Sequence, residues 1–413
     1  MTEVSKSKDI YGVITSLHRG GAERQMLYLL DNDVVSDLFL LENKIEYDIN
    51  PEKSKSIKPL ILSNKIKSPF LKYLLIPFYS FKFSKKINKN STVISFVERA
   101  DLTNIFSKIF KKHKSVVSIL TNPLKAYKGL KLILFPIMMI VYFFSDMLIV
   151  NSKGAAKFIK RFIFLKDKTF TIYNPISIDF IEQKKKELLN DEEKRIFINY
   201  PVFINVARLT DAKGQWHLLR IFKMVKENIT NAKLVIVGDG KLRNYLVSLS
   251  KELGLKTFTH FNNENFNESY DVYFFGSQEN PFKYIYNSSI FVFTSLFEGF
   301  ANVILEALVC EVPVISADCR FGPREILAPE TDFMYETKTS EYGSYGVLMP
   351  ILDERKKTAK DFFSKEEIIW SKTIVDLYKN KTIRDRYTGK SIERVKDFDI
   401  NVIIPEWDKL LNN

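Results

Sequence analysis

The sequence predicts an α/β protein built from two doubly wound domains, each with a parallel sheet covered by helices on both faces. Three observations lead to this prediction. The chain has 413 residues, which is more than one core usually contains. Its short apolar segments are continuous rather than alternating, which is typical of parallel strands buried on both faces. Helical segments separate these strands, and the alternation stops near Asn174-Pro175 and then restarts.

The first set of elements lies before this break. We expect strands at Ile10–Ile14, Thr92–Val97, Ser115–Leu120 and Met147–Val150. Helices are expected after each of them, beginning with the segment GAERQMLYLL from Gly21. This first domain is predicted to span residues 1–176.

The second set follows a polar stretch, residues 181–196, which we interpret as a linker with a solvated helix. Strands are expected at residues 203–207, 233–238, 272–276, 290–295 and 313–317, with helices from Pro281 and Asn302 between them. The second domain is predicted to span residues 177–385. Residues 386–413 are expected to be a helical segment that returns to the first domain. Two such domains would face each other across a cleft, with ligands beyond the carboxyl ends of the strands.

Charge is unevenly distributed along the chain. Residues 51–170 contain 24 Lys and Arg against 5 Asp and Glu, a balance of +19, so the remainder carries −6 of the net +13. This asymmetry indicates an anionic partner, either an acidic membrane surface or a nucleic acid. The alternative is a solvated lysine-rich face. Because the basic residues alternate with bulky apolar ones and no nucleic-acid-binding motif is present, the pattern favours a membrane surface over nucleic acid.

Two further features bear on the cellular setting. The chain has two cysteines, Cys310 and Cys319, too few for a disulfide framework, and its first residues lack the apolar core of a signal peptide. These features favour a reducing, cytoplasmic location. The longest apolar run, residues 132–144, is shorter than the roughly 20 residues that span a bilayer. We expect a buried or half-buried helix there, with a membrane-dipping helix as the alternative.

Two glutamates mark the loop after the strand at residues 290–295. Glu298 lies in the loop SLFEGFAN, and Glu306 lies about one turn into the helix NVILEALV that follows. The backbone N–H groups of residues 300–303 stand at the start of that helix, where a phosphate is favoured. A carboxylate instead accepts from sugar hydroxyls, such as the 2′,3′ pair of ribose. The alternative is that Glu306 is a surface residue of an amphipathic helix.

Other loops at carboxyl ends of strands carry cations and glycines. Arg208 and Lys213 lie after the strand at 203–207, and together they can neutralise a diphosphate. The alternative is two solvated cations. Gly20 and Gly21 follow the first strand and let the backbone approach a ligand closely. The loop at residues 321–325 is another candidate, and residues 237–240 are interpreted as a turn.

Metal-binding patterns are weak. Two Asp-x-Asp sequences exist, Asp31-Asn32-Asp33 and Asp397-Phe398-Asp399, but neither follows a predicted strand. Four histidines without ligand spacing make a zinc site implausible. We therefore predict no metal ion and no cofactor.

Several segments together resemble a known family. They are NVARLTDAKGQWHLLRIF, LVIVGDGKLRNYL, FFGSQENPFKYIYNSSIFVFTSLFEGFANVILEAL and PVISADCRFGPREIL, with LHRGGAERQM, DMLIVNSKGAAKFIKRF and TIYNPI in the first half. The chain resembles the retaining, nucleotide-sugar-dependent glycosyltransferases of family GT4, which have the GT-B fold of two Rossmann-like domains. The spacing of Glu298 and Glu306 matches that family's Glu-x7-Glu signature.

The resemblance assigns roles to the candidate residues. It implies that Arg208 and Lys213 hold the donor diphosphate and stabilise the leaving charge, and that Glu306 binds ribose while Glu298 lies by the donor sugar. The remaining donor-binding residues that it implies are Phe300, Ala301, Asn302, Val303, Gly20 and Gly21. Many relatives carry a histidine where this chain has Thr121-Asn122-Pro123, and Asn122 is the candidate to replace it.

The implied activity is transfer of a hexose or N-acetylhexosamine from a UDP-linked donor to a growing, lipid-linked bacterial surface glycan. The enzyme would be cytoplasmic and bound to the inner face of the cell membrane through its basic region, residues 51–170. One alternative is a same-fold enzyme that epimerises or hydrolyses the nucleotide sugar. Another is a basic membrane- or nucleic-acid-binding protein without catalysis.

Overall fold

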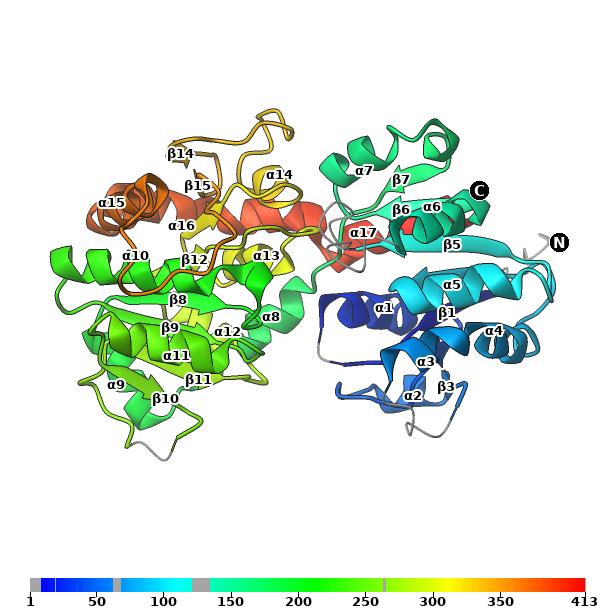
Figure 1. Cartoon of the computed structure of the whole chain (residues 1–413), viewed down its shortest axis with the longest axis horizontal. Coiled ribbons are helices and arrows are strands. Elements are labelled where there is room, and N and C mark those ends of the chain that lie inside the picture. The colour runs from blue at the N-terminus through cyan, green and yellow to red at the C-terminus, as the bar shows by residue number, and fades with distance from the viewer. Residues whose placement is uncertain (1–8, 19, 62–67, 121–133, 263–264, 413) are drawn as a thin grey trace. The chain divides into compact units, whose positions relative to one another are not determined.

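The computed structural model describes residues 9–18, 20–61, 68–120, 134–262 and 265–412 (Figure 1). The chain forms two compact units. The first unit combines Met1–Pro175 with Ile400–Asn413, and the second unit is Ile176–Asp399. The sequence had placed the returning segment from residue 386 onward, whereas residues 386–399 belong to the second unit. Each unit is described by itself below.

The first unit is built on a seven-stranded sheet with the order β3-β2-β1-β4-β5-β6-β7, and its strand pairs are parallel. The strands are β1 Ile10–Ile14, β2 Asp37–Leu40, β3 Ile57–Pro59, β4 Thr92–Phe96, β5 Lys114–Ile119, β6 Met147–Val150 and β7 Thr169–Thr171. Strand order reverses between β1 and β4, so the chain winds outward from these two strands in both directions.

Helices of the first unit connect these parallel strands. They are α1 Gly21–Asp31, α2 Pro51–Ser54, α3 Pro69–Leu74, α4 Ile76–Ser84, α5 Glu98–Ser107, α6 Leu134–Phe144 and α7 Lys153–Ile159, with the 3-10 helix η2 Ile163–Leu165. The last helix, α17 Ile400–Asn412, packs Ile403, Trp407 and Leu411 into the core formed by α1 and the sheet.

The long apolar run of the sequence corresponds to α6, which is half-buried as expected. Met138 and Val141 are buried, while Ile140 and Phe143 are more than half exposed. Within the described parts of the chain, no helix combines the length and hydropathy needed to cross a bilayer.

The second unit has an eight-stranded sheet with the order β10-β11-β9-β8-β12-β13-β15-β14. Its strands pair in parallel except β14, which is antiparallel to β15. The strands are β8 Val202–Val206, β9 Lys233–Val237, β10 Thr257–Thr259, β11 Val272–Gly276, β12 Ile290–Phe293, β13 Val314–Ala317, β14 Glu341–Tyr342 and β15 Val347–Met349. Here the order reverses between β8 and β12.

Helices of the second unit form two groups. In the first group, α10 Gln215–Asn228 contacts both α11 Arg243–Glu252 and α15 Lys365–Lys379. In the second group, α13 Asn302–Val309 contacts four helices: α8 Ile178–Lys184, α12 Phe282–Tyr286, α14 Pro323–Leu327 and α16 Lys381–Val395. The remaining helices are α9 Asp191–Asn199 and the 3-10 helices η3 Asp211–Lys213 and η4 Lys396–Phe398.

The interpretation of residues 181–196 as a linker was wrong. The segment contributes to α8 and α9, which bury Ile181 and Ile196 within the second unit. Lys185 is 2% exposed and donates to the backbone carbonyl of Val309 at 3.0 Å. The polar composition hid this packing because few apolar contacts and one buried lysine anchor the segment.

Candidate functional site

The candidate site lies at the carboxyl ends of β8 and β12, where strand order reverses in the second unit. β8 and β12 pair in parallel, so the loops that leave them, residues 207–214 and 294–301, begin at the same sheet edge. In open α/β sheets this is the position where ligands bind. Five of the residues singled out in the sequence lie in these two loops: Arg208, Lys213, Glu298, Phe300 and Ala301.

Hydrogen bonds fasten the two loops to each other. The hydroxyl of Thr294 donates to the carbonyl of Lys213 at 3.1 Å. The backbone N–H of Leu296 and the hydroxyl of Ser295 both donate to the carbonyl of Ala212, at 2.8 and 3.0 Å. Lys213 therefore has a defined position relative to the loop that carries Glu298.

Gly214 makes this close approach possible. It adopts a left-handed conformation with φ of 61°, and a Cβ atom added there would lie 2.6 Å from the carbonyl oxygen of Thr294. Both facts favour glycine, because other residues rarely adopt this conformation and any side chain would push the loops apart.

Lys213 and Glu298 form an ion pair. The Lys213 ammonium contacts Glu298 Oε1, and the Ser295 hydroxyl donates to the same carboxylate oxygen. The side chains of Lys213 and Glu298 are 17% and 13% exposed, so the pair is shielded but still reaches solvent. The ammonium also lies 5.2 Å from the ring centroid of Phe293. A cation and a hydrogen-bond acceptor are thus held side by side at the sheet edge.

Arg208 extends from the same loop and is exposed. The turn at residues 237–240 holds the backbone of this loop in place. The N–H of Leu209, the residue after Arg208, donates to the Asp239 carbonyl of the turn at 3.0 Å. A Cβ atom at Gly238 would lie 2.1 Å from the carbonyl oxygen of Ala207. The glycines of this turn therefore support the loop that presents Arg208, in addition to forming a turn.

The second glutamate lies in α13. Glu306 is 8% exposed, which rules out the alternative of a solvated surface residue. Ala301 caps the helix in a left-handed conformation, with φ of 67° and ψ of 56°. Asn302 and Val303 form the first turn, and Phe300 is buried. The helix start therefore follows an unusual backbone conformation at a residue that is not glycine.

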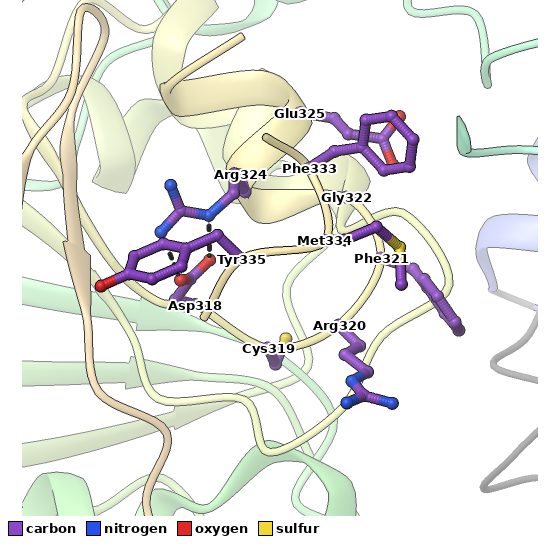
Figure 2. Close-up of a pocket in the computed structure, with 10 residues that line it drawn as sticks. All are labelled: Asp318, Cys319, Arg320, Phe321, Gly322, Arg324, Glu325, Phe333, Met334 and Tyr335. Carbon is purple, nitrogen blue, oxygen red and sulfur yellow. Dashed lines mark hydrogen bonds and ion pairs between the residues drawn. The ribbon is translucent and has the colours of Figure 1, made fainter. Parts of the chain in front are cut away.

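A pocket lies next to this helix start, beyond the carboxyl end of β13 (Figure 2). It is lined by side chains from residues 318–325 and 333–335. A Cβ atom added at Gly322 would lie 2.1 Å from the carbonyl oxygen of Phe300, so the pocket loop and the loop at residues 294–301, here called the donor-side loop after the role that the sequence predicts for it, pack backbone to backbone.

Buried charges hold the pocket loop in place. Figure 2 shows the guanidinium of Arg324 directed at the carboxylate of Asp318, with an Nε to Oδ1 distance of 3.2 Å. Arg324 also donates to Glu341 at 2.7 Å and lies 4.9 Å from the ring centroid of Tyr335. Burial raises the pKa of the neighbouring Cys319 thiol well above its usual value, which disfavours the thiolate that a nucleophilic cysteine needs.

The remaining predicted residues lie elsewhere. Gly20 caps α1 in the first unit, after β1, and Gly21 is the first residue of that helix. The backbone N–H and carbonyl of Gly20 exchange hydrogen bonds with the Tyr47 hydroxyl at 3.0 and 2.7 Å. Asn122 lies outside the described residues. Among the residues that are described, no group of three or more His, Cys, Asp or Glu is arranged to hold a metal ion.

Two residues important to the geometry were not singled out from the sequence. Ser295 orients Glu298, and Gly214 permits the loop contact. Gly214 ends the 3-10 helix η3, and glycine is the usual left-handed residue after a helix, but a helix of three residues leaves no clear pattern in the sequence. Nothing in the sequence alone indicated the role of Ser295.

Comparison with known proteins identifies the family of the chain. Residues 179–342 match the family model described as "Glycosyl transferases group 1". The chain is 38% identical over 373 residues to an uncharacterised glycosyltransferase of Methanocaldococcus jannaschii, covering 86% of this chain and 87% of that protein. It is 30% identical over 354 residues to an N-acetylgalactosamine-N,N'-diacetylbacillosaminyl-diphospho-undecaprenol 4-alpha-N-acetylgalactosaminyltransferase of Campylobacter jejuni, covering 83% and 90%.

Solved structures show the same fold. The Anabaena protein HepE, in complex with UDP and glucose, has a TM-score of 0.68 at 17% identity and covers 98% of this chain and 100% of its own. WaaG, a glycosyltransferase involved in lipopolysaccharide biosynthesis, has a TM-score of 0.67 at 13% identity and covers 97% and 99%. The fold is GT-B, as predicted. The chain belongs to the group 1 glycosyltransferase family and is a glycosyltransferase.

Proposed function

We propose that this enzyme transfers a hexose or N-acetylhexosamine from a UDP-linked donor to a growing, lipid-linked bacterial surface glycan, with retention of the anomeric configuration. One observation carries the proposal. At the point where strand order reverses in the second unit, Lys213 and Glu298 are paired, with Arg208 on the same loop. A cation and an acceptor at this edge suit a phosphorylated sugar.

In this proposal the diphosphate lies against Arg208 and Lys213. An arginine fork binds two phosphate oxygens at once, and an ammonium adds a point charge. As the glycosyl group leaves, the nucleoside diphosphate gains negative charge. Cations already positioned there stabilise the transition state more than the ground state, and the start of α13 adds its dipole. The reaction then needs no metal ion or cofactor.

The carboxylates act on hydroxyl groups. Glu306 accepts from the ribose hydroxyls, and Glu298 accepts from the donor sugar once the diphosphate draws Lys213 toward its own oxygens. Backbone N–H groups of Phe300, Ala301, Asn302 and Val303 bind the sugar or the phosphates. In the first unit, Gly20 and Gly21 allow close approach to the donor, and Asn122 supplies a contact to the sugar.

The sugar and acceptor classes are proposed from relatives. The printed name of the Campylobacter jejuni relative specifies an N-acetylgalactosaminyl group and a diphospho-undecaprenol acceptor. A Salmonella typhimurium relative, 29% identical over 162 residues, is a lipopolysaccharide 1,6-galactosyltransferase. HepE, of the same fold, was crystallised with UDP and glucose. These names support UDP as the nucleotide and a lipid-linked glycan as the acceptor.

The test begins with nucleotide binding. Calorimetry with UDP, GDP and ADP should give heat with UDP, and UDP at a hundredfold excess over its Kd should stabilise the protein by about 2.7 kcal/mol. Arg208→Ala should impair both UDP binding and turnover, whereas Arg195→Ala, an exposed arginine of α9, should affect neither. Binding of none of the three nucleotides would refute the proposal.

Product analysis separates transfer from its alternatives. With a UDP-sugar and a lipid-linked acceptor, NMR of the product should show the donor's anomeric configuration. A changed sugar stereochemistry in free UDP-sugar would identify an epimerase, and free sugar formed equally with and without acceptor would identify a hydrolase. Activity should survive EDTA, and strict dependence on Mn²⁺ or Mg²⁺ would contradict the metal-free mechanism.

A membrane surface is the second proposed partner, and we propose that residues 51–170 provide it. The proposal rests on six exposed rings of the first unit, here called the aromatic ridge: Phe78, Phe81, Phe110, Phe143, Phe144 and Phe164. They lie on α4, after α5, on α6 and on η2. Phe81 packs on Phe110 and Phe143 on Phe164, with ring centroids 5.4 and 5.6 Å apart.

Lysines accompany the ridge. The ammonium of Lys85 lies 4.2 Å from the Phe81 centroid, and that of Lys168 lies 5.5 Å from the Phe143 centroid. Exposed aromatic rings with adjacent lysines suit the headgroup region of an anionic leaflet, where each well-placed lysine contributes about 1 kcal/mol. Such binding would place the enzyme in the cytoplasm, at the inner face of the membrane that presents a lipid-linked acceptor.

Vesicle sedimentation tests this surface. Binding should be stronger to vesicles of phosphatidylcholine with phosphatidylglycerol than to pure phosphatidylcholine, and it should weaken as salt screens the charges. Phe143→Ser with Phe164→Ser should reduce binding, while Phe362→Ser, at a 97% exposed ring of the second unit, should not. Equal binding to both vesicle types would contradict the proposal, and tight binding to DNA or RNA would favour a nucleic-acid partner instead.

A further inference from the structure

The sequence Asp397-Phe398-Asp399 has a structural explanation that does not involve a metal ion. Asp397 is paired with Arg394, one turn earlier. Asp399 forms a parallel bridge with Ile176. The Asp397 carboxylate is therefore engaged in an ion pair, Asp399 is held through its backbone, and the residue between them is the one that reaches toward the candidate site.

Phe398 packs on the loop that carries the candidate donor residues. Its ring centroid lies 5.5 Å from that of Phe300, and the two side chains are 1% and 2% exposed. The guanidinium of Arg394 also lies over the Phe398 ring, 4.5 Å from its centroid. Phe300 precedes Ala301, so this packing acts directly on the strained helix start.

Arg394 holds a second element against the same loop. Its Nε and Nη2 atoms donate to the backbone carbonyls of Ile326 and Glu325, at 2.9 and 2.5 Å. These carbonyls belong to α14, which begins after Gly322, the residue whose backbone packs on the Phe300 carbonyl. Residues 394–398 thus support the donor-side loop both directly and through α14.

The same short segment leads directly into one of the two places where the chain passes between units. The chain enters the second unit at Pro175–Ile176 and leaves it at Asp399–Ile400. The N–H of Ile176 donates to the carbonyl of Phe398 at 2.9 Å, which joins the two passages. Phe398 therefore binds the crossing through its backbone and the donor-side loop through its ring.

We propose that Phe398 and Arg394 are positioning residues that fix the loop at residues 300–303. Through these two residues, binding of the donor nucleotide to the loop stabilises the paired chain crossings at Ile176 and Asp399. The inference rests on the proposed donor site. A nucleotide held by the backbone of residues 300–303 restrains Phe300, and the buried ring contact passes this restraint to the Ile176–Phe398 hydrogen bond. Coupling energies between linked sites correspond to about 5- to 150-fold effects.

Hydrogen exchange of the full-length protein with and without UDP tests this coupling. UDP should slow exchange of the Ile176 amide by at least about fivefold more than that of the His260 amide. The His260 amide donates to the Phe274 carbonyl near the edge strand β10, away from β8 and β12. Its exchange rate therefore reports any general stabilisation of the unit by ligand. In Phe398→Leu, UDP should still bind but the excess protection of Ile176 should disappear.

Matched variants distinguish positioning from mere stability. Phe398→Tyr keeps the ring and should restore the excess protection, and Phe362→Leu, at an exposed ring of the same unit, should keep it. If Phe398→Leu does not fold, Arg394→Lys provides the test, because it keeps the charge and loses the two carbonyl contacts. UDP binding without excess protection of Ile176 in the wild type would overturn this inference alone. Absence of nucleotide binding would overturn the donor site and the inference together.

Discussion

The two units place a helix at the same topological position but use it differently. In the first unit β4 lies beside β1 and leads into α5, and in the second unit β12 lies beside β8 and leads into α13. Both helices are capped by a residue other than glycine with positive φ, Val97 at 78° and Ala301 at 67°. Such conformations cost roughly 1–3 kcal/mol and cluster at functional sites.

The length of the loop makes the difference. In the first unit α5 begins directly after Val97, and Glu98 accepts a hydrogen bond from the Tyr73 hydroxyl at 2.9 Å. Burial, with the adjacent Glu98 carboxylate, raises the pKa of Tyr73 to about 12, so this contact is a stable neutral-to-charged hydrogen bond. In the second unit a long loop lets Glu298 reach Lys213 instead. The topology of the sheet therefore determines where the helix and its nearby glutamate lie, and the length of the preceding loop determines which side chain that glutamate contacts.

The largest expected effect concerns how each unit buries charge. In the second unit Glu367 is fully buried and accepts from His217 at 2.7 Å and from Arg220 at 2.8 Å. In the first unit, Glu42 is paired with two cations, Arg99 and Lys72, but remains 18% exposed. Glu367→Gln should destabilise the second unit by about 3–5 kcal/mol because it leaves the buried guanidinium of Arg220 uncompensated, and Glu42→Gln should cost clearly less. Chemical denaturation of both variants measures this, and equal losses would break the comparison.

The same network sets an acid limit. Burial alone would raise the pKa of Glu367, but hydrogen bonds from His217, Arg220 and Ser364 lower it to about 2. Because the folded pKa is below the unfolded value, this carboxylate contributes stability that is fully present above about pH 4.5 and is lost as the pH falls toward 2. The free energy of unfolding of the wild type should therefore fall by about 3 kcal/mol over this pH range, and that of Glu367→Gln should not show this fall.

The next effect is on catalysis. Glu298→Gln should leave UDP affinity nearly unchanged and lower turnover by about 10²-fold, the scale of one lost transition-state contact. Glu98→Gln, the matching change in the first unit, should alter turnover by no more than about twofold. Calorimetry and steady-state kinetics on both variants provide the measurement. Normal turnover of Glu298→Gln would remove Glu298 from the reaction.

A third effect belongs to binding alone. Glu306→Gln keeps the shape of the side chain but loses a charged acceptor, and a hydrogen bond to a charged group contributes about 1.5–3 kcal/mol. The Kd for UDP should therefore rise roughly tenfold or more. Titration calorimetry measures this Kd. With deoxy-UDP as a control ligand, the Kd should differ less between the variant and the wild type. Unchanged affinity for UDP would mean that the buried Glu306 has only a structural role.

Much of this architecture followed from the sequence, and the exceptions have physical causes. The strands β1, β6 and β11 were predicted with the bounds that the structure has, because they are continuous apolar runs. The strands β2, β3, β7, β10, β14 and β15 were not predicted, because all of them but β2 have only two or three residues, which is too short for a clear apolar pattern. Arg208, Lys213 and Glu298 were singled out from their positions after strands, but the contact between Lys213 and Glu298 depends on the conformation of Gly214, which the residue order alone does not fix.

The smallest expected effect tests the two strained caps directly. Ala301→Gly and Val97→Gly remove the steric cost of positive φ, about 1–2 kcal/mol, and lose part of that gain because glycine is more flexible when unfolded. Each should stabilise its unit by up to about 1 kcal/mol, which raises the thermal midpoint by roughly 2–4 °C. Ala307→Gly, inside α13, should instead destabilise by about 1 kcal/mol because a regular helical position gains nothing from glycine. Differential scanning calorimetry should therefore show opposite signs for two changes of the same chemistry within one helix and its cap. If Ala301→Gly lowers the midpoint as Ala307→Gly does, the left-handed cap carries no cost, and the parallel drawn between α5 and α13 fails.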